Sequence, residues 1–85
     1  MVKVAYVCWD DASGIRGPLS VKEAARQVPI PMRSAGILVG EDEDCVRLAQ
    51  DYYTWPMDGG VEERVRDLEV IPRKFITKMK TWEVK

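Results

Sequence analysis

The stretch VIPRKFI, residues 70–76, decides the fold because it turns one strand-like run into another at a single corner. β-Branched and apolar residues predict a strand over residues 64–71, and a second strand follows over residues 75–84. Between them, a proline and two basic residues at 72–74 make a tight corner. Small β-barrels often turn this sharply before a short last strand, so the stretch predicts a small, strongly bent sheet.

The chain begins with an alternating run that predicts another strand, over residues 2–9. The side chains of this strand divide into two faces: Val2, Val4, Tyr6 and Cys8 on one, and Lys3, Ala5, Val7 and Trp9 on the other. Both faces are rich in apolar residues. We therefore expect the strand to be mostly covered on both sides.

A short helix is expected after the first strand. Ser20 and Glu23 form the S-x-x-E capping box, in which side chains satisfy the free amides of a helix start. Pro29 ends the helix, because proline has no amide to donate and its ring clashes with the preceding turn. The narrow apolar stripe between these residues predicts a helix that lies on a larger part of the fold.

Two further strands, over residues 32–39 and 45–52, form a hairpin around an acidic turn. Gly36 and Gly40 indicate a β-bulge or a close approach of another backbone. Pro and Gly residues then predict a loop over residues 53–62 before the next strand.

These elements predict a single, mainly β domain over residues 1–85, in the order strand, helix and four more strands (β-α-β-β-β-β). Five short strands cannot bury two faces as a flat sheet. We therefore expect a small five-stranded barrel of the SH3-like or Sm-like kind, with one short helix after the first strand. The core of so small a domain gives modest stability, and such folds often gain the rest by oligomerising.

The composition excludes several kinds of chemistry. The chain contains no histidine, which removes the usual general base at neutral pH and the commonest metal ligand. The residues show no activated nucleophile or matched acid–base pair, so we expect no enzyme activity, no metal and no cofactor. Cys8 and Cys45 stand in no metal or redox spacing, and we expect reduced thiols. Because no apolar run could span a membrane and no signal peptide is found, we expect a cytoplasmic protein.

A series of short motifs runs through most of the chain. They are, in order, Trp9-Asp10-Asp11-Ala12, Gly36-Ile37-Leu38, Glu41-Asp42-Glu43-Asp44, Leu48-Ala49 and Ile71-Pro72-Arg73-Lys74-Phe75-Ile76. This series resembles a widespread group of short, uncharacterised proteins encoded by phages and prophages, whose chains carry W-x-D-A, an acidic turn and I-P-K-x-x-I. The resemblance implies a shared fold and a phage-like origin. Arg73 stands where the group has lysine and Ile37 where an aromatic is common, and either change could alter a ligand preference.

The stretch WDDAS, residues 9–13, has two interpretations. In one, Asp10 or Asp11 accepts backbone hydrogen bonds in the turn that leaves the strand, and Trp9 packs beneath the helix. In the other, Trp9 stacks on a planar ligand while Asp11 and Ser13 bond its polar edge. A metal site is not expected, because Asp10 and Asp11 point in opposite directions if the strand continues.

Aromatic and basic residues supply the other candidate sites. Trp55 lies in the expected loop, which either contacts a ligand or another subunit, or closes one end of the barrel. A positive end of the chain is formed by Arg73, Lys74, Lys78 and Lys80, and Arg33 is expected on the neighbouring hairpin. Guanidinium groups grip phosphate in a bidentate manner. The alternative is a charged edge that prevents aggregation between strands.

Two classes of binding function follow. In the first, a homo-oligomer forms pockets at its subunit junctions, where Trp9 or Trp55 stacks on a base and arginines hold phosphates. A phage-like protein of this design would sequester a nucleotide signal of bacterial immunity. In the second class, the domain binds a host protein or a nucleic acid directly and inhibits or modulates a host factor.

Overall fold

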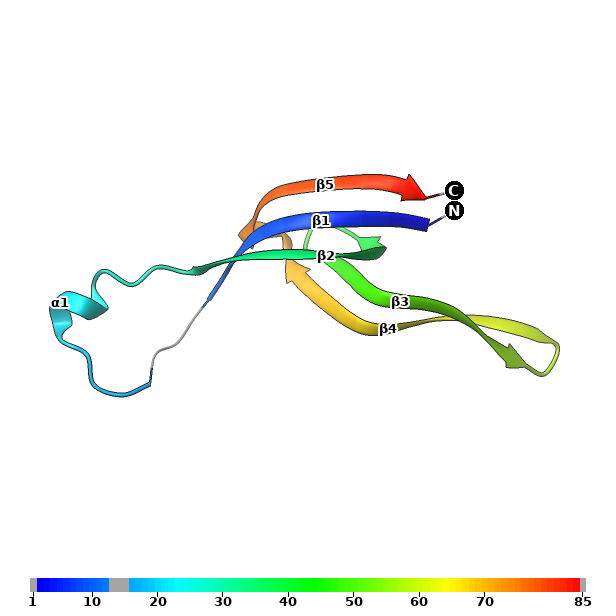
Figure 1. Cartoon of the computed structure of the whole chain (residues 1–85), viewed down its shortest axis with the longest axis horizontal. Coiled ribbons are helices and arrows are strands. Elements are labelled where there is room, and N and C mark those ends of the chain that lie inside the picture. Colours follow the sequence, from blue (N-terminus) through cyan, green and yellow to red (C-terminus); the bar gives the residue numbers. More distant parts are fainter. Residues whose placement is uncertain (1, 13–15, 85) are drawn as a thin grey trace.

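The computed structural model describes residues 2–12 and 16–84, which form a mainly β fold (Figure 1). The elements are β1 (Val2–Asp11), α1 (Val21–Ala24), β2 (Ile30–Glu41), β3 (Cys45–Met57), β4 (Gly60–Pro72), the 3₁₀ turn η1 (Arg73–Phe75) and β5 (Ile76–Val84). The predicted order of strand, helix and four strands is confirmed. The tight corner predicted at residues 72–74 is formed by the end of β4 and by η1.

The strands form one antiparallel sheet in the order β4-β3-β2-β1-β5. A five-stranded sheet closes into a barrel only when its two edge strands pair with each other. Here β4 and β5 are the two outer strands of the sheet and do not pair with each other. The sheet is therefore open, and the closed SH3-like or Sm-like barrel is not confirmed.

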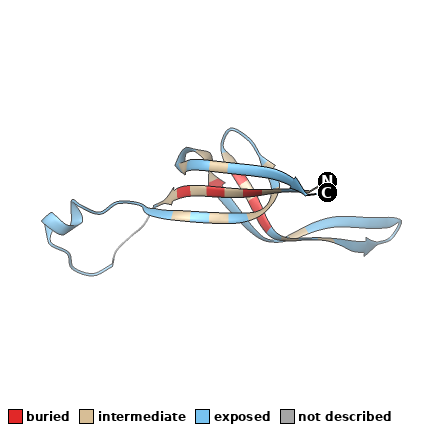
Figure 2. Ribbon diagram, turned by 45° about the horizontal axis from the view of Figure 1, so that its top comes forward, coloured by how far each residue is buried: buried red, intermediate tan, exposed pale blue. Residues whose placement is uncertain are grey.

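The hydrophobic core lies on one face of this sheet. The buried residues are Ala5, Val7, Trp9, Val46, Leu48, Ala49 and Ile71. Alternate residues of β1 are buried, whereas the residues of its opposite face are only half-buried, so the predicted coverage of both faces is found on one face only. In Figure 2 the buried positions gather where β1 and the first residues of β3 lie, while most of the remaining ribbon is exposed.

The two features predicted from the glycines of β2 are both present, a close approach of another backbone at Gly36 and a β-bulge next to Gly40. A Cβ atom at Gly36 would lie 2.8 Å from the carbonyl oxygen of Ala49, so glycine is needed for the close approach of β3. The β2–β3 register shifts between Leu38 and Gly40, which leaves Val39 as the extra residue of a bulge.

The helix is shorter and less supported than the sequence predicted. The Ser20 hydroxyl accepts a hydrogen bond from the Glu23 amide at 3.0 Å, so the predicted cap is present. However, α1 spans only Val21–Ala24 and buries no residue, and Figure 1 shows it far out on an excursion from the sheet. The expectation that the helix lies on a larger part of the fold is wrong, because its narrow apolar stripe contacts no sheet face.

The predicted loop over residues 53–62 is also wrong. The strands β3 and β4 continue as a two-stranded ribbon to a turn at Asp58-Gly59, where Met57 pairs with Gly60. We call residues 51–66 the arm. The ladder is interrupted where Asp67 adopts a left-handed backbone with φ 58°, and beyond this point the ribbon projects from the sheet (Figure 1).

These two projections give the molecule an extended shape. Its principal extents are 62 × 26 × 19 Å, and its radius of gyration is 17.6 Å. A compact domain of this length has a radius of gyration of about 12 Å. Much of the chain therefore lies outside the packed part of the sheet.

Two predictions made from composition can be compared with the structure. Cys8 and Cys45 are both free thiols, as their spacing predicted. In residues 2–12 and 16–84, no helix has the length and apolar character that crossing a lipid bilayer requires.

Candidate ligand-binding face

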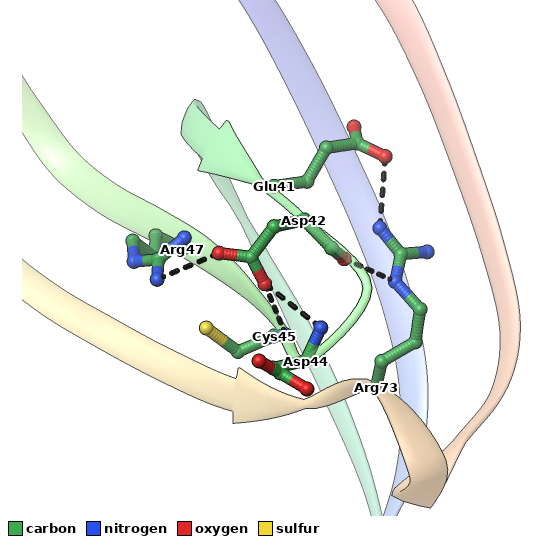
Figure 3. Close-up of polar contacts among 6 residues, drawn as sticks. All are labelled: Glu41, Asp42, Asp44, Cys45, Arg47 and Arg73. Atoms are coloured by element: carbon green, nitrogen blue, oxygen red, sulfur yellow. Dashed lines mark hydrogen bonds and ion pairs between the residues drawn. The ribbon is translucent and has the colours of Figure 1, made fainter.

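The acidic turn between β2 and β3 is organised by Asp42 (Figure 3). The Asp42 carboxylate accepts hydrogen bonds from the backbone amides of Cys45 at 2.9 Å and Asp44 at 2.8 Å, and from the Arg47 guanidinium at 3.1 Å. These donors favour the charged form and lower the pKa of Asp42 from 3.8 to about 2, with the Cys45 amide as the largest cause. The turn is exposed, but its central carboxylate has a fixed structural role.

Arg73, a predicted phosphate ligand, fastens this turn to η1. Its guanidinium donates to the backbone carbonyl of Asp42 at 2.9 Å and forms an ion pair with Glu41 at 2.9 Å. Its own amide donates to the carbonyl of Asp44 at 2.8 Å. The acidic motif and the I-P-R-K-F-I motif are thus in direct contact, and the charge of Arg73 is already opposed by a carboxylate. Its neighbour Lys74 places its ammonium 5.3 Å from the centre of the Phe75 ring.

The WDDAS stretch is divided between the core and the end of β1. Trp9 is only 9% exposed, packs in the core cluster and donates its indole N–H to the Ser34 hydroxyl at 3.0 Å. β1 continues through Asp11, which pairs with Ile30, so Asp10 and Asp11 alternate between the two faces of the strand. Ser13 lies outside the described residues. The packing and the satisfied indole favour the interpretation of Trp9 as a core residue, although its packing partners are strands and not the helix.

Three basic residues gather on the face of the sheet opposite the core. Arg33 of β2 and Lys78 of β5 both pair with Cys8, from its two sides, and Lys80 pairs with Tyr6. Directly paired residues project to the same face, so these cations form a cluster across β2, β1 and β5 that we call the basic row. The ion pairs within residues 2–12 and 16–84 all involve other arginines.

Tyr6 and Cys8 lie between the cations of the basic row. The hydrogen bond between Tyr6 and Cys8 is the largest cause that raises the pKa of Tyr6, and partial burial adds to it. The Arg33 charge acts in the opposite direction and lowers the pKa of the same phenol. Tyr6 lies on the same face as Arg33, Lys78 and Lys80, so this face carries a hydroxyl donor among positive charges, an arrangement that can bind an anion.

Lys78 and Lys80 were not among the expected ligand-binding residues, although they were part of the positive end. Their spacing of two residues in a strand places both on one face, and this signal is present in the sequence. Their position beside Arg33 depends on the register of β1 with β2 and β5, which no local pattern reveals.

Trp55 lies on the arm, where aromatic rings and guanidinium groups contact one another. The Arg64 guanidinium lies 5.3 Å from the Trp55 ring centre, and Arg66 lies 5.6 Å from the Tyr53 ring centre. The rings of Tyr53 and Trp55 meet edge to face at 6.5 Å. The aromatic residues thus form a local cluster on one face of the arm, and they do not close the end of a barrel.

Within one chain, the predicted site residues do not form a single pocket. Trp9 and Arg33 project to opposite faces of the sheet, since Trp9 is in the core and Arg33 pairs with Cys8. Arg73 and Lys74 are at the corner, and Trp55 is on the arm. In residues 2–12 and 16–84, no group of three carboxylate or thiol side chains could hold a metal ion.

A groove of about 480 Å³ lies where the arm leaves the sheet. Its lining residues come from three strands of the sheet and from the base of the arm, and include Val2, Lys3, Ile37, Val39, Tyr52 and Val65. The residues of the basic row are not part of its lining. The groove and the basic row are therefore separate candidate surfaces.

Comparison with known proteins adds no relative: no protein-family model, curated protein or solved structure matches this chain.

Proposed function

We propose that this chain is a non-enzymatic binding protein that holds a phosphate-bearing ligand against the basic row. The observation that carries the proposal is the meeting of Arg33, Lys78 and Lys80 on one sheet face, where none of them forms an ion pair with another described residue. A guanidinium and two ammonium groups on one face supply the positive charge and the hydrogen-bond donors that a phosphate binds. The lack of histidine in the sequence supports binding in preference to catalysis.

The ligand that we propose is a nucleotide, enclosed at a junction between copies of the chain. Small ligands bind in concave sites that cover most of their surface, whereas the basic row is outside the groove of the single chain. A second copy would supply the missing wall. Together with the resemblance to phage proteins, this supports a sponge that sequesters a nucleotide signal of bacterial immunity in the host cytoplasm.

The open character of the same face favours a second candidate function. An exposed row of cations on a sheet can follow the backbone of an extended polyanion without any enclosing wall. In this alternative the chain is a nucleic-acid-binding module that modulates a host factor. A single-stranded oligonucleotide would then bind, and mononucleotides and cyclic dinucleotides would not.

Calorimetric titration with cyclic dinucleotides, ADP-ribose derivatives and single-stranded oligonucleotides tests the proposal. The variant Arg33→Ala/Lys78→Ala/Lys80→Ala should keep the circular dichroism of the parent and bind the ligand at least about tenfold more weakly. The matched control, Arg16→Ala/Lys22→Ala/Arg26→Ala, removes the same charge from the exposed segment around α1 and should bind like the parent. If no ligand of the panel binds the parent, or if the two variants bind equally, the basic row is not the site.

A further inference from the structure

The single chain exposes more surface than its size requires. Its solvent-accessible area is 6778 Å². A compact monomer of 9.7 kDa exposes about 5,100 Å², so the excess is about 1,700 Å². The arm and the segment around α1 both contribute to this excess, and two chains that covered all of it on each other would bury about 3,400 Å² in total, which is within the range of permanent homodimers.

The two faces of the arm differ in how many contacts their side chains make within the chain. One face carries Tyr53 and Trp55 with the two arginines that lie over their rings. The other face carries Tyr52 and Val65, which are directly paired, and further out Pro56 and Val61, which are also paired. Val61 is 70% exposed and Tyr52 is 41% exposed. We call this second face the apolar face of the arm.

Tyr52 and Val65 continue the apolar face into the groove. At the base of the arm they line the groove together with Val2, Ile37 and Val39 of the sheet, and Glu63 and Arg64 add polar groups to the lining. Apolar side chains therefore lie at the tip of the arm and in the groove at its base, with the Thr54–Glu63 pair between them. Exposed apolar patches of this kind mark interaction sites.

We infer that the occupant of the groove is the arm tip of a second copy of this chain. Two arms that pack antiparallel across a twofold axis place each tip against the base of the other arm. The arrangement is isologous and closes after two copies, as in most homodimers. The groove and the apolar tip belong to the same chain, so the two contacts of the dimer are equivalent.

The tip of the arm and the groove offer one pair of opposite charges. Asp58 lies in the turn at the tip, and Lys3 of β1 lines the groove together with Glu63 and Arg64. Within residues 2–12 and 16–84 neither residue takes part in an ion pair. The antiparallel arrangement brings Asp58 of one copy to Lys3 of the other, twice in each dimer.

This inference goes beyond the proposed function, because the dimer forms through the arm and the groove, which are separate from the basic row. Sedimentation velocity of the full chain should give a mass of twice 9.7 kDa. Val61→Asp should weaken the dimer at least about tenfold, because it places a charge at an apolar contact. The matched control is Val21→Asp on α1, which alters a valine that is 88% exposed and should leave the mass unchanged.

Exchanging the charges of Asp58 and Lys3 tests whether the arm tip of a second copy occupies the groove. Asp58→Lys and Lys3→Asp should each weaken the dimer, and the double variant should recover association. A monomer at all concentrations, equal dimerisation of Val61→Asp and Val21→Asp, or a double variant no better than the single ones overturns the inference. A monomer that still binds a nucleotide refutes the arm interface and leaves the basic row intact. A dimer that binds no ligand of the panel refutes the proposed function and leaves the arm interface intact.

Discussion

The sheet body and the arm are built from the same strands but are stabilised in different ways. The sheet body comprises β1, β2, β5 and the ladder of residues 45–49 with residues 68–72. Every buried residue of the described chain belongs to this body, and none belongs to the arm. The body is held by burial of apolar side chains, and the arm is held by contacts across two strands.

This difference shows which part of the molecule can be stable alone. An isolated two-stranded ribbon is at best marginally stable in water, because it has no second layer to bury a face. Cation–π contacts and exposed ion pairs on the arm each contribute about 0–1 kcal/mol. The arm therefore needs a partner for its apolar face, while the body does not.

Trp9 in the body and Trp55 on the arm offer the largest contrast. Trp9→Ala should lower the free energy of unfolding by about 3–5 kcal/mol, because it opens a cavity in the core and removes the hydrogen bond to Ser34. Trp55→Ala on the arm should cost at most about 1 kcal/mol, the value of its contact with Arg64. Urea unfolding at a protein concentration that keeps the chain monomeric measures both. Equal losses would remove the distinction between body and arm.

Two glycines of β2 test how tightly the body is packed. Gly36→Ala should cost about 1–3 kcal/mol, because its Cβ would lie 2.8 Å from the Ala49 carbonyl oxygen. Gly40→Ala is the matched control, since no atom lies within 4 Å of its Cβ position, and it should change stability by less than about 0.5 kcal/mol. Thermal unfolding of the two variants gives the comparison. If both melt like the parent, the close approach of β3 to β2 does not constrain the fold.

Local patterns predicted the body better than the arm. Alternation in residues 2–9 identified β1 as a strand but not which of its faces is buried, and the proline corner identified the boundary of β4 and β5. The arm was missed because Pro56 and the two glycines were interpreted as loop signals. Proline is tolerated here because this part of β3 pairs only with β4. The Asp58-Gly59 pair is a common two-residue hairpin turn and could have identified the ribbon.

The candidate site was predictable only in its composition. The basic residues were recognised, but the grouping of Arg33 with Lys78 and Lys80 depends on two strand registers. Closure of the sheet likewise depends on whether two distant edges pair, which the alternation within a strand does not reveal. The involvement of Arg73 with the acidic turn is a contact between segments far apart in sequence.

The acidic turn predicts a dependence of body stability on pH. The folded-state pKa of Asp42 is about 2, below its ordinary value of 3.8. The unfolded chain binds the proton more tightly, so the stabilisation is fully present above about pH 4 and is lost as pH falls towards 2. Melting temperature should fall over this window, and Asp42→Asn should show a smaller fall. An unchanged acid profile in the variant would mean that Asp42 does not stabilise the turn.

The smallest effect is expected at the helix, the other projection from the body. A lost cap costs about 0.5–2 kcal/mol of helix stability. Because α1 buries no residue, Ser20→Ala should change global unfolding by less than about 0.5 kcal/mol and accelerate amide exchange only around α1. A global loss as large as the cap energy would show that the helix is coupled to the body, contrary to its exposed position.

The central claim is that the body is stable alone and that the arm is stabilised by a second copy. Amide hydrogen exchange measured over a range of protein concentrations tests it most directly. We predict that protection of the body amides is independent of concentration, and that protection of residues 52–65 rises as the dimer forms. Arm amides whose protection stays the same from the most dilute to the most concentrated sample would contradict the account.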